Sequence, residues 1–166
     1  MNKNATNTNL VEDLGVSIKK RAEILDQTKW VHDFSWIEIE TLATYLRLNN
    51  AVKNSVILKE GVGEHFLAII VHGTVGIYKQ DPENHLKELA IIGPGQTIGE
   101  MSMIDGSQCS ATVIATDNLS VLTMSKTAMN NLINEKPNVA IKFILKIARI
   151  LSQRLRMTSS NLVDLL

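Results

Sequence analysis

The side chains best suited to chemistry gather in residues 99–112, which read Gly-Glu-Met-Ser-Met-Ile-Asp-Gly-Ser-Gln-Cys-Ser-Ala-Thr. Gly99 lets a backbone approach a partner closely, and the residues that follow it should begin a helical turn. Free N–H groups and the helix dipole both favour an anion at such a position. Glu100 can accept a hydrogen bond from a hydroxyl group, and Ser110 can donate one to an anion. The segment therefore combines a helix start that favours an anion with side chains that can hydrogen-bond to a ligand.

This segment resembles the phosphate-binding cassette of cyclic-nucleotide-binding domains, the family that includes the catabolite activator protein. The family pattern opens with Gly-Glu and closes with Pro-Arg-Ser/Ala-Ala-Thr. Residues 56–61 and 66–78 are similar to the early strands of the family, and residues 154–159 are similar to its ligand-facing helix. The resemblance runs from residue 34 to residue 166. It implies a regulatory domain that binds cAMP or cGMP as a ligand, and no cofactor.

The resemblance also implies roles for single residues. In the family the cassette glutamate, here Glu100, holds the ribose 2′-hydroxyl, and two helix hydroxyl residues, here Thr158 and Ser159, contact the base. A helix arginine, here Arg154, should pair with Glu100. The ligand-binding residues implied are Gly99, Glu100, Met101, Ser102, Cys109, Ser110, Ala111, Thr112, Arg154, Thr158 and Ser159.

Cys109 departs from the family pattern, because the cassette arginine that pairs with the cyclic phosphate stands at this position in the family. A hydrogen bond to a charged group contributes about 1.5–3 kcal/mol. Its loss should weaken binding by about ten- to one-hundred-fold. Gln108 can donate a neutral hydrogen bond as a partial substitute. A reactive role for Cys109 has little support, since no histidine or second cysteine is near it in the sequence.

The composition excludes several classes of protein. The 166 residues suit one domain with a proper core. Lys plus Arg and Asp plus Glu both number 17, so the chain is not built to grip nucleic acid or an anionic membrane. The single cysteine excludes an intrachain disulfide, and we expect a cytoplasmic protein because no signal peptide or long apolar run is present. The four histidines are scattered, which argues against a metal site or an enzyme.

The first 50 residues are expected to form a polar tail and two helices. Apolar residues at helical spacing, from Leu10 to Leu25, predict an amphipathic helix over residues 10–28. Ser35 and Glu38 have the spacing of a capping box. The helix that follows is predicted to run to about Leu48, with Asn49 and Asn50 as its stop.

Residues 51–125 change to short runs rich in Val, Ile and Thr, separated by Gly, Pro, Asn and Asp. Such spacing is typical of a sandwich or barrel, and the resemblance narrows it to a double-stranded β-helix jelly roll. The fold class is thus mainly β with flanking helices and a long C-terminal helix. The predicted strands are 55–59, 66–71, 74–80, 86–91, 97–98, 110–116 and 119–124.

Residues 126–166 are predicted to form two helices, a short one capped by Ser125 and a long one that starts at Pro137. The long helix carries a heptad seam of apolar spacing that is typical of a paired helix. A second apolar stripe, which includes Phe143 and Ile147, suits packing on the roll. The sequence therefore favours a homodimer through this helix over the alternative of a single helix with one wide buried face. The seam consists of Ile144, Ala148, Leu151, Leu155, Thr158, Leu162 and Leu165.

Three functions compete. The preferred one is a stand-alone cyclic nucleotide sensor that acts by ligand-gated regulation. A DNA-binding regulator would need a reading motif after the long helix, and the sequence ends at Leu166. The main rival is a degenerate domain that has lost its ligand and serves as an interaction or dimerisation module.

Overall fold

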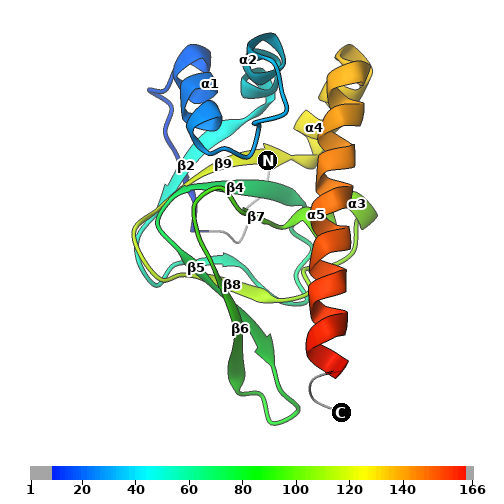
Figure 1. The fold of residues 1–166 in the computed structure, drawn as a ribbon. Coiled ribbons are helices and arrows are strands. Elements are labelled where there is room, and N and C mark those ends of the chain that lie inside the picture. Colours follow the sequence, from blue (N-terminus) through cyan, green and yellow to red (C-terminus); the bar gives the residue numbers. More distant parts are fainter. Residues whose placement is uncertain (1–8, 164–166) are drawn as a thin grey trace, which may run out of the picture.

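The computed structural model describes residues 9–163 and shows two antiparallel sheets face to face, with helices beyond one of them (Figure 1). The longest helix, α5, runs down one side of the molecule. In chain order the elements are β1 (Val11–Glu12), α1 (Ile18–Gln27), α2 (Trp36–Tyr45), β2 (Arg47–Ala51), β3 (Val56–Leu58), β4 (Phe66–His72), β5 (Val75–Gln80), β6 (Leu86–Ile92), β7 (Thr97–Ile98), α3 (Glu100–Asp105), β8 (Thr112–Ala115), β9 (Leu119–Ser125), α4 (Lys126–Glu135) and α5 (Pro137–Val163).

The five-stranded sheet has the order β1-β2-β9-β4-β7, and the four-stranded sheet has the order β3-β8-β5-β6. Successive side chains of a strand point to opposite faces of its sheet. In β4, Ala68 and Ile70 pack into the core between the sheets, whereas Leu67 and Ile69 pack into a second core under the helices. All four residues are fully buried. The five-stranded sheet is therefore covered on both faces.

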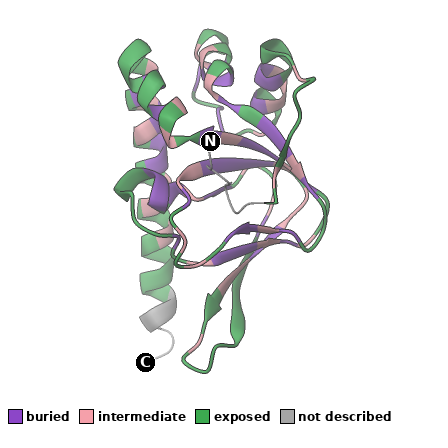
Figure 2. Cartoon of the chain, turned by 180° about the vertical axis from the view of Figure 1, so that it is seen from behind, coloured by how far each residue is buried: buried purple, intermediate pink, exposed green. Residues whose placement is uncertain are grey.

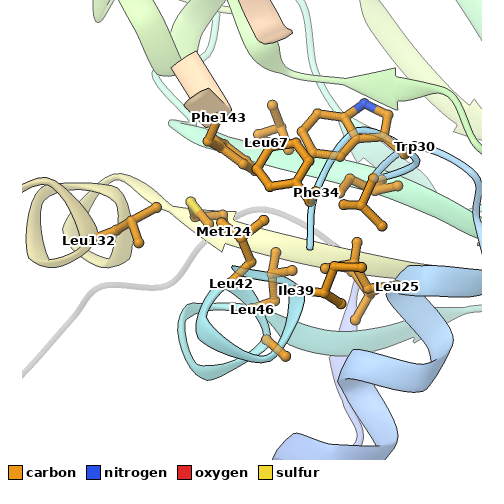
Figure 3. Close-up of a cluster of buried hydrophobic side chains, with 14 of the residues drawn as sticks. Leu25, Trp30, Phe34, Ile39, Leu42, Leu46, Leu67, Met124, Leu132 and Phe143 are labelled. Carbon is orange, nitrogen blue, oxygen red and sulfur yellow. The ribbon is translucent and has the colours of Figure 1, made fainter. Parts of the chain in front are cut away.

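The second core joins α1, α2, α4 and the first half of α5 to the five-stranded sheet (Figure 3). Phe143 of α5 is fully buried, and its ring centroid lies 5.1 Å from that of Trp30. Leu42 of α2 and Leu132 of α4 are also fully buried in this cluster. The long helix is thus fixed to the molecule at its N-terminal end.

The jelly-roll fold and its strands are confirmed, with shifts of one or two residues at most strand ends. The capping box is also confirmed: the Ser35 amide donates to Glu38 at 2.7 Å, and the Glu38 amide donates to the Ser35 hydroxyl. The Ser125 hydroxyl accepts from the Ala128 amide at 3.1 Å and begins α4, as its position predicts.

The prediction of a helix over residues 10–28 is wrong in its first half. The helix begins only at Ile18, after Ser17 caps it by accepting from the Lys20 amide. Residues 11–12 instead form β1, which pairs with β2. Leu14, an expected member of the helical stripe, is 87% exposed. The spacing of apolar residues was accidental here, because tertiary strand pairing overrides local periodicity.

The prediction that the second helix reaches Leu48 is also wrong, so the first 50 residues contain strands as well as helices. The helix ends at Tyr45, and Leu46 already has an extended backbone. Residues 47–51 form β2, which pairs along its length with β9. Asn49 does not stop a helix, since its side-chain amide donates to the Thr123 hydroxyl across the sheet at 2.7 Å.

Burial falls along α5 from its N-terminal to its C-terminal half (Figure 2). Phe143 and Ile147 of the predicted roll-facing stripe are buried as expected. Ile144 and Leu151 of the predicted seam are partly buried against the helical core, whereas Leu155 is 68% exposed. The Leu162 side chain and Leu165 lie outside the described residues. Across residues 9–163, no helix has both the length and the apolar character that a membrane span requires.

Candidate ligand-binding site

A cavity of about 590 Å³ lies between the four-stranded sheet, α3 and the C-terminal half of α5. Its volume falls in the range of small-molecule sites. The cavity brings together segments that are far apart in the sequence, namely residues 99–102, 109–111 and 154–158. Apart from Thr112 and Ser159, all the ligand-binding residues expected from the sequence line this cavity.

Gly99 and Ser102 set the position of α3 at the cavity. Gly99 has a φ of +77°, and a Cβ atom there would lie 2.2 Å from the carbonyl oxygen of Phe66. Only glycine fits this turn. The Ser102 hydroxyl lies 2.9 Å from the carbonyl oxygen of Glu64, to which it donates, so α3 is tied to the segment before β4. The helical turn predicted after Gly99 is therefore present, and it places Glu100 at the cavity wall.

Glu100 and Arg154 form an ion pair across the cavity. The Glu100 side chain is 3% exposed and that of Arg154 is 38% exposed. Arg154 also donates to the carbonyl oxygen of Thr97 at 2.7 Å. Burial lowers the pKa of Arg154 from its ordinary value, yet a guanidinium remains charged at neutral pH. The predicted pair is therefore observed, and it connects α5 to the start of α3.

Cys109 lies at the cavity wall but points its thiol into the protein. The residue is 5% exposed, and its Sγ atom lies 3.6 Å from the carbonyl oxygen of Glu64. Burial raises the pKa of the Cys109 thiol, and the charge of the nearby Glu64 carboxylate raises it further. The thiol is thus protonated at neutral pH and supplies no charge to a ligand.

The remaining cassette residues differ in what they offer. Ser110 is exposed, and its hydroxyl makes only a 3.6 Å contact with the sulfur of Met101. Thr112 is buried away from the cavity, and its hydroxyl accepts from the Glu60 amide at 3.1 Å. Thr112 thus joins two chain segments, whereas the Ser110 hydroxyl is free to rotate towards a ligand. Ala111 contributes a small apolar side chain to the wall.

The two helix hydroxyl residues occupy different positions. Thr158 lines the cavity, and its hydroxyl donates to the carbonyl oxygen of Arg154 at 3.0 Å. The Ser159 hydroxyl makes the same kind of bond to Leu155 at 2.9 Å, and Ser159 does not line the cavity of this chain. Only Thr158 of this pair can therefore reach a ligand within one subunit.

An apolar wall from β6 is part of the site that the sequence did not indicate. Leu89 and Ile91 line the cavity although they are 62% and 60% exposed. Met157 of α5 also lines it and is 67% exposed. The β5–β6 hairpin extends beside the C-terminal half of α5, so this wall faces the helix (Figure 1). The sequence signal for this wall was the presence of apolar residues in a hairpin strand that packs against no core.

The chain is similar to a known protein family and to a known transcriptional regulator. The sequence pattern described as the cyclic nucleotide-binding domain matches residues 49–136. The chain is 27% identical over 128 residues to a Mycobacterium tuberculosis protein named "CRP-like cAMP-activated global transcriptional regulator". That alignment covers 77% of this chain and 55% of the regulator, so the chain spans about half the regulator's length.

Two solved structures show the same fold. A cyclic nucleotide-binding domain from Methylobacillus flagellatus is 29% identical with a TM-score of 0.82, over 95% of this chain and 90% of that one. The catabolite activator protein of Thermus thermophilus is 25% identical with a TM-score of 0.72, over 82% of this chain and 62% of that one. The similarity therefore extends beyond the cassette to most of the residues described above.

Proposed function

The chain belongs to the cyclic nucleotide-binding domain family, and on that premise we propose that it is a regulatory module that binds a ribose-bearing ligand between α3 and α5. It acts as a binding module and not as an enzyme. Cyclic AMP or cyclic GMP is the first ligand class to consider, because the Mycobacterium tuberculosis relative is named as cAMP-activated. A partner protein detects whether the cavity is occupied from the position of α5.

The Glu100–Arg154 pair is the observation that carries this proposal. A hydroxyl group of the ligand that donates to Glu100 must share the carboxylate with Arg154. Arg154 is the only described side chain of α5 that forms an ion pair with the roll at the cavity. A ligand therefore acts directly on the contact that holds the C-terminal half of α5. The ligand therefore binds the protein with different affinities in two positions of the helix. A ligand-gated change requires this difference in affinity.

The proposal includes a cytoplasmic homodimer that pairs through α5. The exposed face of α5 carries Ile141, Leu145 and Leu155, with exposed fractions of 57%, 51% and 68%. Ile141 and Leu145 are four residues apart and Leu155 lies ten residues further on, so all three fit the apolar positions of one heptad repeat. A second subunit covering this face would also bring its own helix hydroxyl residues near the cavity.

A second candidate is a domain without a ligand that serves only as an interaction module. The buried thiol of Cys109 favours it, because the position that should supply a cation supplies none. Arg154 favours it as well, since the two terminal nitrogen atoms of its guanidinium already contact Glu100 and the carbonyl oxygen of Thr97.

Calorimetric titration separates the two candidates. We expect cAMP or cGMP to bind with a dissociation constant on the order of tens of micromolar or weaker. Glu100→Ala should weaken a ribose-bearing ligand by about 1–3 kcal/mol, because the ligand hydroxyl loses its acceptor. Glu40→Ala, at an exposed carboxylate of α2, is the matched control and should change nothing. Unchanged affinity in Glu100→Ala contradicts the assigned site, and no binding by any ribose-bearing compound supports the interaction module.

A further inference from the structure

The charges at the cavity cancel. Among the described residues that line it, Arg154 is the only cation and Glu100 is the only carboxylate, and they pair with each other. A ligand with one negative charge would therefore enter without a cation to balance it. Burial of an unpaired charge is strongly disfavoured, whereas burial of a neutral polar group needs only a hydrogen bond.

No neighbouring cation replaces the missing one. Lys126 donates to the carbonyl oxygen of Met103 in the cassette at 2.6 Å and does not line the cavity. Lys79 donates to the carbonyl oxygen of Ser110 at 2.7 Å. Its ammonium group also pairs with Glu60 at 2.5 Å, and Lys79 does not line the cavity. Gln108 is exposed and does not line the cavity either. The neutral substitute considered from the sequence is thus absent from the wall.

The cassette side chains also offer few hydrogen-bond donors to the cavity. The Cys109 thiol points into the protein, where its Sγ atom donates to the backbone carbonyl of Glu64 at 3.6 Å. The Ser102 hydroxyl is already committed to the Glu64 and Gly99 carbonyl oxygens, at 2.9 and 3.2 Å. Among the described cassette side chains that line the cavity, the Ser110 hydroxyl is thus the one donor left for a ligand.

The groups that remain suit an uncharged ligand. Glu100 can accept a hydrogen bond from a ligand hydroxyl, and the exposed Ser110 hydroxyl can bond a second one. Leu89, Ile91 and Met157 offer an apolar wall against which a flat ring can lie. The cavity volume of about 590 Å³ accommodates a ring joined to a sugar. The combination is one of hydroxyl recognition at one end and an apolar surface at the other.

We propose that the cavity selects an uncharged ribonucleoside over the corresponding cyclic monophosphate. This inference rests on the proposed function, because it names the ligand class of the same site. The phosphate is the part of a cyclic nucleotide that this cavity handles poorly, while the ribose hydroxyl and the base keep their partners. A 2′-deoxynucleoside should bind less well, since the hydroxyl that donates to Glu100 is then missing.

Calorimetric titration of the 166-residue chain tests the inference with six probes, namely adenosine, guanosine, the 2′-deoxy form of each and the cyclic monophosphate of each. We expect at least one nucleoside to bind about tenfold or more tightly than its cyclic monophosphate. We expect its 2′-deoxy form to bind about fivefold or more weakly. A cyclic monophosphate that binds as tightly as its nucleoside, or more tightly, overturns the inference while the proposed function stands.

Two arginine variants sharpen the result. Cys109→Arg should tighten the cyclic monophosphate by about tenfold or more and leave the nucleoside nearly unchanged, because a guanidinium can make two bonds to a phosphate. Its gain should shrink with added salt. Gln108→Arg adds the same charge at the neighbouring exposed position and should change the preference little. The order of affinities in the unmodified protein decides the question even if Cys109→Arg does not fold.

The remaining outcomes are also decisive. If Lys79→Met abolishes tight binding of a cyclic monophosphate, then Lys79 is the missing cation and the inference is wrong. If the nucleoside and its 2′-deoxy form bind equally, the ribose is not recognised and the inference is wrong. If no nucleoside and no cyclic monophosphate binds, the proposed function fails and the inference fails with it.

Discussion

The two halves of α5 are held in different ways. In the first half Phe143 and Ile147 are buried in the helical core, and Lys146 forms a 2.5 Å ion pair with Asp33. In the second half the apolar residues Leu155 and Met157 are exposed. There the ion pair of Arg154 is the polar contact with the roll. Figure 2 shows the same change as a loss of buried surface along the helix.

Under the proposed function, the first half of this helix is a support and the second half responds to the ligand. The first half has many apolar contacts, whose energies add, so no single small ligand can displace it. The second half depends on few contacts, and one of them involves a carboxylate that a ligand can share. Local stability differs within one element, and segments that move are drawn from the less stable part.

Phe143→Ala should produce the largest effect, because it removes the largest buried side chain of the first half. We expect a loss of about 3–5 kcal/mol in the free energy of unfolding, measured by urea denaturation. Met157→Ala, at an exposed position of the second half outside the proposed dimer face, should change this free energy by about 0.5 kcal/mol or less. Similar losses in the two variants would remove the distinction between the halves.

The exposed face of α5 should hold the proposed dimer. Leu145→Glu together with Leu155→Glu places charges on this face and should weaken dimerisation by about 3 kcal/mol or more, measured by sedimentation. Leu151 is less suitable for this test, since it packs against the helical core of its own chain. Gln153→Glu with Ser160→Glu adds the same charge to the polar face and should leave the dimer intact. A monomeric unmodified protein at micromolar concentration contradicts the dimer.

Arg154→Met should have an intermediate effect on stability. It removes the contact of the second half and leaves the Glu100 carboxylate buried without its cation. We expect a loss of about 2 kcal/mol, less than for a fully buried pair because Arg154 is partly exposed. Adding Glu100→Gln to this variant should recover part of the loss, since no charge is then buried. A second substitution that only adds to the loss would show that the two residues act independently.

The pair of Asp33 and Lys146 should give the smallest effect, seen as a pH dependence. Burial alone raises the pKa of Asp33, but the hydrogen bond and charge of Lys146 outweigh it, so the pKa lies below its ordinary value. Such a carboxylate stabilises the fold above its unfolded pKa and loses this contribution as the pH falls through the folded pKa. We expect about 0.5–1 kcal/mol. Lys146→Met should flatten the stability curve below about pH 4, and an unchanged curve would contradict the role of the pair.

The sequence predicted those parts of the molecule that local chemistry determines. Ser35 and Ser125 cap helices through their own neighbours, and the β-branched runs form strands as expected. The position of Arg154 opposite Glu100 followed from the family resemblance and is observed. In each case the deciding residues lie close in sequence or in a known motif.

The parts that the sequence did not predict depend on distant partners. Asn49 and Asn50 have low strand propensity, yet β2 forms because β9 supplies its hydrogen bonds and the Ser120 hydroxyl donates to Asn50 at 2.6 Å. Leu89 and Ile91 became part of the site only because the hairpin that carries them lies beside α5. The distance between the hairpin and the helix cannot be inferred from any local sequence pattern.

Strand β4 has a consequence for how sequence change is tolerated in this protein. Leu67, Ala68, Ile69 and Ile70 alternate between two filled cores, and the strand is paired with β9 on one side and β7 on the other. An inserted residue would exchange the contents of the two cores at once, since each side chain would move to the opposite face. The segment can therefore vary by exchange of side chains of similar volume but not in length. The length of β4 therefore fixes the spacing of the helical layer and of the cavity.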